Sequence, residues 1–269
     1  LIYNEYNIAI SFGISMCISI MVCSIGYLLT NNYVKVKSNF GISLVIASVT
    51  WIGASLISGL AFYLCGDFNS FLDAFFDSIS GFTTSGFSLI NDLDHISKGV
   101  NMWRHLLAFV GGQGIIVFAL VFVIKGATGI FKMYEAEGKD ERIYPSTGHT
   151  AKFIIKISLI FLVIGTICLT IVGKYIGLRW DNAFLHGLWI FMSTWAGCGF
   201  TPMSQNILYY HSGLYELIMC IFMILGTLNF GLHFAIMHGN IKELFKNSEV
   251  KTFTVIMFLI SILAIIGLV

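Results

Sequence analysis

The chain has 269 residues and a net charge of +1; 57% of its residues are hydrophobic and only 11% are charged. A soluble domain carries about 25% charged residues, and a single soluble core of this size could not hide so much apolar surface. The composition therefore excludes an ordinary soluble enzyme, a nucleic-acid-binding protein and a disordered chain. It predicts an integral membrane protein.

Six apolar runs are long enough to cross a bilayer, since a transmembrane helix needs roughly 20 apolar residues. The chain starts at Leu1 rather than at a methionine and stops inside its last apolar run, so we expect a fragment cut at both ends. The six runs are 8–30, 41–65, 102–125, 153–173, 214–237 and 252–269.

Two further apolar stretches, 71–82 and 183–195, are too short to cross. Each holds only about a dozen residues, and each is followed by a segment that contains glycine. Stretches of this length are typical of buried or re-entrant segments. We expect two short helices that enter the bilayer and return to the same side.

Lysine and arginine are distributed unequally along the chain. Eleven of them lie in or beside 31–40, 126–152 and 238–251, whereas four lie in the other connecting segments. Basic residues collect on the cytoplasmic side of membrane proteins. The bias predicts an external N-terminus, two short stretches that face outside, and a multi-pass protein of the plasma membrane, which in bacteria is the inner membrane.

A shift of 113 residues aligns the two short stretches without gaps. Ser80 then lies over Ser193, and Gly86 lies over Gly199, each followed by phenylalanine. The flanking order is also the same: a spanning helix, a short helix, a loop with glycine, and a second spanning helix. Such self-similarity indicates a repeated structural unit.

The loop in each unit must be buried in protein or line a water-filled path, because lipid cannot satisfy non-helical backbone. Neither 83–88 nor 196–201 contains a charged side chain. Backbone carbonyl oxygens can replace the hydration shell of a cation, and the negative end of a short helix favours a cation as well. The pattern favours a cation pathway; a loop that merely plugs a helix bundle is the alternative.

Several polar residues stand out against this apolar background. Asp77 lies midway along the first short stretch, where an unpaired charge costs about 2.5–3.5 kcal/mol, so we expect it to brace the loop or to pair with Arg104. Asn229 and His233 share a helix face, either as a polar contact between helices or as a pore-lining pair. Five carboxylates form either a solvated loop or an electrostatic funnel for cations: Asp67, Asp73, Asp77, Asp92 and Asp94.

At these segments the sequence resembles the Trk/Ktr/HKT superfamily of potassium transporters. The segment 73–86, DAFFDSISGFTTSG, is similar to the first pore loop of that family. The segment 103–116, WRHLLAFVGGQGII, is similar to the helix that follows this loop, and we expect its glycines to pack closely behind the filter. The segment 193–203, STWAGCGFTPM, resembles the second pore loop.

The resemblance implies an all-α membrane protein built from units of helix, re-entrant pore helix, filter loop and helix around a pseudo-fourfold pore. Four such units form the pore in the family, and this sequence supplies the first two. The expected divisions are a preceding helix with a cytoplasmic link at 1–40, a first repeat at 41–126, a cytoplasmic connector at 127–152, a second repeat at 153–238, and a link with the first helix of a truncated third repeat at 239–269.

The resemblance also implies a function and a site. The function is potassium uptake across the plasma membrane, channel-like or coupled to Na⁺ or H⁺. Glycine at the position of Gly86 goes with potassium permeation in the family, and serine there goes with sodium preference. The selectivity filter would bind the ion through the backbone carbonyls of Thr83, Thr84, Ser85, Gly86, Ala196, Gly197, Cys198 and Gly199.

The implied partners are K⁺, the lipid bilayer, cytosolic nucleotide-binding regulatory subunits and a second copy in a homodimer, with no nucleic acid. Two alternatives stay within ion transport: a two-unit channel subunit whose homodimer completes the four loops, and a Na⁺-permeable member of the same family. A membrane-embedded enzyme would have to use Asp77, His105 or His233. Their spacing matches no metal or acid–base site, so we expect no enzyme.

Overall fold

The structure is a computed structural model that describes residues 5–30, 40–118 and 147–268. Every regular element in these ranges is a helix, as the prediction of an all-α membrane protein requires. The first group of helices is α1 (Tyr6–Thr30), α2 (Phe40–Cys65), α3 (Phe71–Phe82) and α4 (Lys98–Phe118). The second group is α7 (Thr147–Tyr175), α8 (Trp180–Ala196), η3 (Asn206–Tyr210), α9 (Gly213–Thr227), α10 (Phe230–Met237), α11 (Lys242–Lys246) and α12 (Ser248–Leu268).

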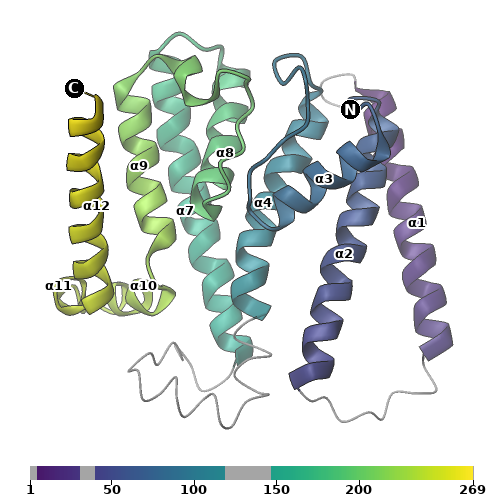
Figure 1. The fold of residues 1–269 in the computed structure, drawn as a ribbon, viewed down its shortest axis with the longest axis horizontal. Coiled ribbons are helices and arrows are strands. Elements are labelled where there is room, and N and C mark those ends of the chain that lie inside the picture. The colour runs from purple at the N-terminus through teal and green to yellow at the C-terminus, as the bar shows by residue number, and fades with distance from the viewer. Residues whose placement is uncertain (1–4, 31–39, 119–146, 269) are drawn as a thin grey trace.

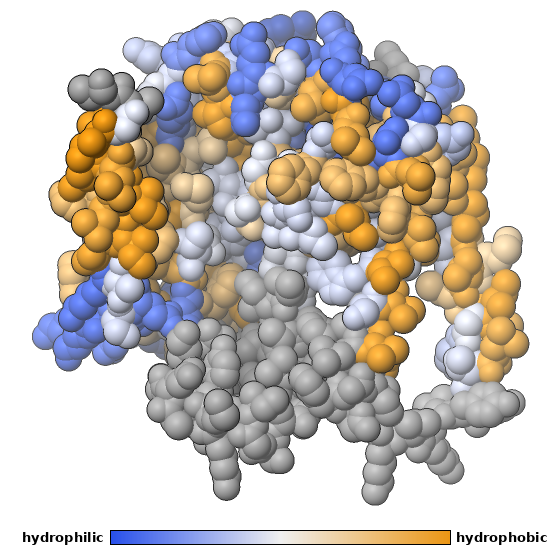
Figure 2. Space-filling model, viewed as in Figure 1, coloured by the Kyte–Doolittle hydropathy of each residue, from blue (hydrophilic) through white to orange (hydrophobic). Residues whose placement is uncertain are grey.

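The long helices run side by side, while α3 and α8 occupy only the upper half of the molecule in Figure 1. Within the described residues, α1, α2, α7 and α12 are long and apolar enough to cross a membrane. The expected span 102–125 begins in α4 and continues into residues that lie outside the described ranges. Figure 2 shows apolar side chains covering α12, and no residue in its apolar window is buried within the described chain.

The predicted span 214–237 is wrong as a single helix. The structure breaks it into α9 and α10, which meet at an angle of 99°. Leu228 is extended at the break, and the side chain of Asn229 accepts a hydrogen bond from the N–H of Gly231 at 2.6 Å, which caps α10. His233 Nε2 donates to the carbonyl of Leu225 at 2.9 Å, so it satisfies one of the free carbonyls at the end of α9.

The Asn229 and His233 side chains thus make local caps at this break. Hydropathy hides the break because the residues on both sides of it are apolar. These hydrogen bonds of the two side chains are directed at the backbone of α9 and α10.

The two predicted short helices are confirmed. Helix α3 begins after Ser70, whose hydroxyl accepts a hydrogen bond from the N–H of Asp73 at 3.1 Å, the usual way to satisfy a free amide at a helix start. It spans Phe71–Phe82, the predicted range. Helix α8 spans Trp180–Ala196 and is longer than predicted, because its first turn includes polar residues that the apolar pattern leaves out.

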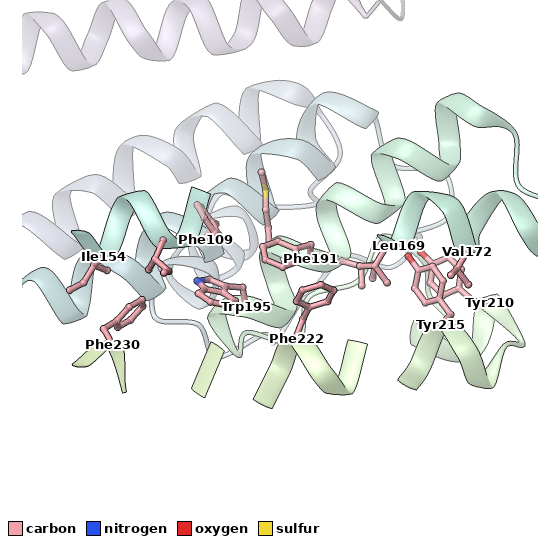
Figure 3. Packing of buried hydrophobic residues seen from close by; sticks show 13 residues of the cluster. Phe109, Ile154, Leu169, Val172, Phe191, Trp195, Tyr210, Tyr215, Phe222 and Phe230 are labelled. Atoms are coloured by element: carbon pink, nitrogen blue, oxygen red, sulfur yellow. The ribbon is translucent and has the colours of Figure 1, made fainter. Parts of the chain in front are cut away.

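A core of aromatic side chains holds α7, α8 and α9 together (Figure 3). Trp195 and Phe191 of α8 lie between Phe222 of α9 and Phe109 of α4 in this cluster. At the other end of the core, the rings of Tyr210 and Tyr215 stack at 4.0 Å. Helix α4 contacts both α3 and α8, so it joins the two units.

Candidate functional site: two matching loops at the ends of the short helices

The loops that follow α3 and α8 have the same backbone conformation. Thr84 and Gly197, which the 113-residue shift pairs, have φ angles of 55° and 66°. The next pair, Gly86 and Gly199, has φ angles of 76° and 86°. All four residues therefore lie in the left-handed region that favours glycine. The repeat in the sequence is also a repeat in backbone geometry.

Both short helices end in the same pair of hydrogen bonds. The N–H of Ser85 donates to the carbonyl of Ser80 at 2.9 Å, and the N–H of Cys198 donates to the carbonyl of Ser193 at 3.0 Å. The amides of the two left-handed residues before them bond to carbonyls three residues back. This is the Schellman arrangement, and it turns the chain out of both helices in the same way.

Thr84 carries backbone strain that its partner in the second loop does not. A β-branched residue at φ 55° is uncommon, and such a conformation costs on the order of 1–3 kcal/mol. The second loop has Gly197 at the equivalent position, where the cost is absent. Strained backbone of this kind persists where the surroundings enforce it, and it clusters at functional sites.

The two loops touch each other. A Cβ atom built on Gly86 would overlap the carbonyl oxygen of Cys198. Because any side chain would occupy that space, glycine is required for this approach, in addition to the φ of 76°. The structure therefore brings the predicted site residues of the two loops to one place, with Gly86 and Cys198 at the point of contact.

The loops hold carbonyl oxygens that no hydrogen bond uses. The N–H groups at the end of each short helix are hydrogen-bonded to carbonyls of the same helix. Within the described residues, no donor forms a hydrogen bond with the backbone carbonyls of the loop residues that come next. Thr83 is different, since its carbonyl accepts a hydrogen bond from the Thr84 hydroxyl at 2.7 Å. Free oxygens of this kind are available to a dehydrated cation. They belong to Ser85, Gly86, Gly197, Cys198 and Gly199.

Helix α4 packs tightly behind both loops, as its glycines predict. A Cβ on Gly111 would overlap the carbonyl oxygen of Phe82 at the end of α3, and a Cβ on Gly112 would lie 3.0 Å from Ala196 Cβ at the end of α8. In the second unit, a Cβ on Gly226 would lie 2.6 Å from the carbonyl oxygen of Trp195. Both units thus place a glycine of the second long helix against the end of the short helix.

The predicted pairing of Asp77 with Arg104 is confirmed. Arg104 Nε donates to Asp77 Oδ2 at 2.8 Å and its Nη2 donates to Oδ1 at 3.3 Å. Both side chains are buried, with relative exposures of 1% and 0%. Asp77 also accepts a hydrogen bond from Ser88 Oγ at 2.6 Å, just beyond the first loop. The carboxylate therefore braces that loop as well as pairing with the arginine.

The ion pair also contacts the second loop, which the sequence did not predict. The guanidinium carbon of Arg104 lies 4.3 Å from the ring centre of Phe200. Asn101 accepts from Arg104 Nη1 at 3.4 Å and donates to the carbonyl of Pro202 at 3.4 Å. Asn101 and Pro202 are 101 residues apart along the chain, and Phe200 is about as far from Arg104. In the sequence, only the match between the two repeated units indicates that these two segments meet.

Comparison with known proteins gives a match over nearly all of the chain. Residues 10–267 match the TrkH family, described as cation transport protein. The chain belongs to the TrkH family. A solved structure is similar as well, the crystal structure of the potassium transporter TrkH from Vibrio parahaemolyticus, with a TM-score of 0.64 and 27% identity over 84% of this chain and 44% of that chain.

Curated relatives of this TrkH-family chain include an uncharacterized cation transporter of Methanocaldococcus jannaschii, 28% identical over 82% of this chain and 44% of the relative. Another is the Trk system potassium uptake protein TrkG of Escherichia coli, 29% identical over 79% of this chain and 43% of the relative. The chain spans somewhat less than half the length of these relatives. Family and helices together make it a multi-pass membrane protein.

Three of the five carboxylates singled out in the sequence lie in different surroundings in this TrkH-family chain. Asp77 is buried in its ion pair, so it is not part of a solvated funnel. Asp94 bridges the units, because it accepts hydrogen bonds from Ser204 N at 2.8 Å and Ser204 Oγ at 2.6 Å, which lower its pKa. Asp67 lies half-buried, and that burial raises its pKa.

The enzyme alternative has no support in the TrkH family, which consists of ion transporters. Asp77 is held by Arg104, and His105 Nδ1 bonds to the carbonyl of Asn101 at 2.7 Å in a fully buried position. Within the described part of the chain, no three metal-binding side chains gather at one place.

Proposed function

We propose that this chain contributes two of the loops that line a potassium-selective pathway for uptake across the plasma membrane. The observation that carries the proposal is the contact between two loops with matching φ angles, in which the carbonyls of Ser85, Gly86, Gly197, Cys198 and Gly199 accept no hydrogen bond within the described residues. Replacing water by backbone oxygens is how selectivity filters bind dehydrated cations. The filter residues are those predicted from the sequence: Thr83, Thr84, Ser85, Gly86, Ala196, Gly197, Cys198 and Gly199.

The ion is K⁺ in this proposal, because relatives such as TrkG are potassium uptake proteins by name. The neutral surroundings of the loops also suit a monovalent cation. Asp77 and Arg104 compensate each other, so no unpaired charge from this pair acts on the pathway. Na⁺ is the alternative ion, and Gly86 favours K⁺ by the family resemblance.

Further units around the same axis are part of the proposal. Phe200 is 2% exposed beneath Arg104 of the preceding unit, whereas its counterpart Phe87 is 69% exposed. Gly86 lies against the second loop, whereas a Cβ on Gly199 would meet no described atom within 4 Å. A preceding unit would cover Phe87, and a following unit would supply the contact at Gly199, which gives a pseudo-fourfold ring.

Four units in one chain or two chains of two units could complete this ring. The mass of the polypeptide and the number of subunits in the purified complex, measured together, distinguish these two arrangements. We expect four units per chain, a homodimer of such chains, and cytosolic nucleotide-binding subunits bound to the basic side. Passage is either channel-like or coupled to Na⁺ or H⁺.

The test is complementation. The complete gene, expressed in a bacterium that lacks its own potassium uptake systems, should restore growth at low external K⁺ but make no difference at high K⁺. The empty vector is the control, and immunoblotting of membranes verifies that the protein is present. Absence of rescue by a protein present in the membrane at a normal level would contradict the proposal.

A further inference from the structure

One of the contacts between the second loop and the first unit is a small buried cluster of Ala108, Cys198 and Phe200. Ala108 lies on α4, one turn beyond Arg104, and the other two residues belong to the second loop. The position of one loop relative to the other therefore depends on what α4 presents at this cluster.

Arg104 presents a buried planar cation there. One edge of its guanidinium group donates to the two oxygens of Asp77, and its carbon atom Cζ lies over the ring of Phe200, 4.3 Å from the ring centre. A cation over an aromatic face is attractive, and more so when water is excluded. Because a guanidinium is planar and rigid, the hydrogen bonds that hold its edge against α3 also fix the position of Cζ over the Phe200 ring.

Two further hydrogen bonds connect the ion pair to residues just beyond the two loops. Asn101 joins Arg104 to the carbonyl of Pro202, two residues after Phe200. On the other side, Asp77 bonds to Ser88, two residues after Gly86. The buried ion pair is thus linked to the side chain of Ser88 just past the first loop and to the backbone of Pro202 just past the second.

The second unit does not repeat this arrangement. The 113-residue shift places Ile190 over Asp77, and Ile190 is buried without charge. The short helix of the second unit can therefore hold its own loop without an ion pair. Support of a loop by its own short helix therefore does not by itself explain why an arginine is buried here. The comparison favours a role for Arg104 between the two loops.

We propose that Arg104 is a positioning residue for ion discrimination: it helps to set the separation of the two loops through its hydrogen bonds to Asp77 and its cation–aromatic contact with Phe200. The inference rests on the proposed potassium pathway. In a filter that discriminates by the size of its site, K⁺ and Na⁺ are distinguished by the spacing of opposing oxygens, whereas transport as such does not depend on that spacing. Loss of this link is therefore expected to lower selectivity more than total flux.

Arg104→Lys and Phe200→Leu are the variants that test the link. Lysine keeps the charge opposite Asp77 but cannot offer both a forked edge and a flat face. Phe200→Leu keeps an apolar side chain and removes the aromatic face. The matched controls are Arg179→Lys, at the exposed start of α8, and Phe245→Leu, on the exposed side of α11.

Two readouts are made on the full-length protein. The first is the ratio of Rb⁺ to Na⁺ uptake in proteoliposomes, and the second is the difference between melting temperatures in K⁺ and in Na⁺. A cation–aromatic contact is worth about 1–2 kcal/mol, so each variant should lower the uptake ratio by roughly fivefold to thirtyfold. The double variant should lose no more than the larger single loss, because both changes remove the same contact.

Either of two results would overturn the inference. In one, a selective wild-type protein keeps its uptake ratio and its K⁺-specific melting difference in both variants. In the other, the losses in the two variants add fully, which would mean that they act separately. If the wild-type protein shows neither Rb⁺ uptake nor K⁺-specific stabilisation, the proposed function is contradicted. The proposed role of Arg104 is then contradicted as well, because it rests on that function. If Arg104→Lys does not fold, Phe200→Leu decides alone.

Discussion

Asp77 and Arg104 hold opposite charges in a place where neither is tolerated alone. Removing one member of a buried ion pair is strongly destabilising, by about 3–5 kcal/mol, whereas an apolar replacement of both members is often neutral. Ile190 occupies the position equivalent to Asp77 in the second unit, so this fold accepts an apolar residue there.

Asp77→Asn should therefore destabilise the protein strongly, because it leaves the Arg104 cation buried without its carboxylate. The double variant Asp77→Leu/Arg104→Met should recover most of the lost stability. Thermal unfolding of the purified full-length proteins measures both effects. A single variant as stable as the wild type, or a double variant worse than the single one, would show that the charges do not depend on each other.

Asp94 joins the outer loops of the two units through Ser204, and the bonds from Ser204 lower its pKa. A carboxylate whose pKa is lowered by folding stabilises the folded state above its ordinary value of 3.8, and that contribution is lost as the pH falls through the folded pKa. The link is therefore present at neutral pH and absent in acid.

Ser204→Ala should accordingly melt below the wild type at neutral pH, and the gap should close on acidification. The comparison uses melting temperatures of both proteins from neutral pH to about pH 3. A gap that stays constant over this range would mean that Ser204 acts independently of the Asp94 charge.

At the scale of single elements, the ends of α3 and α8 are the parts that carry the site. Both helices could be predicted from the sequence because they are apolar, short and bounded by polar or glycine-bearing segments. The break between α9 and α10 could not, since Leu228 and Asn229 interrupt an apolar run without lowering its hydropathy much. Asn229 as a helix cap is the one local signal that was available.

Gly226→Ala tests how closely the second long helix must approach the short one. Its Cβ would lie 2.6 Å from the carbonyl oxygen of Trp195, so we expect a loss of about 1–3 kcal/mol from overpacking. Gly53→Ala in α2 is the matched control, because nothing described lies within 4 Å of its Cβ and alanine is the better helix former. Unfolding of the two variants side by side gives the comparison. Equal stability of both would contradict close packing at Gly226.

At the scale of the whole molecule, the two units form one site because α4 lies between their short helices. The existence of two units follows from the 113-residue alignment, and the matching φ angles in both loops are its structural counterpart. Their mutual placement could not be predicted. It depends on contacts such as Arg104 on Phe200 and Gly86 on Cys198, which join residues far apart in sequence and leave no periodic pattern.

The central claim is that the carbonyls of the two touching loops select the ion, and substitution of Gly86 tests it most directly. The measurement is the ratio of Rb⁺ to Na⁺ uptake by proteoliposomes containing the wild type, Gly86→Ser or Gly177→Ser. Gly177 is the matched control, since it also has a positive φ, of 102°, but its Cβ would meet no described atom within 4 Å. The account predicts that Gly86→Ser shifts the ratio toward Na⁺ while Gly177→Ser leaves it unchanged. An unchanged ratio in Gly86→Ser would contradict it.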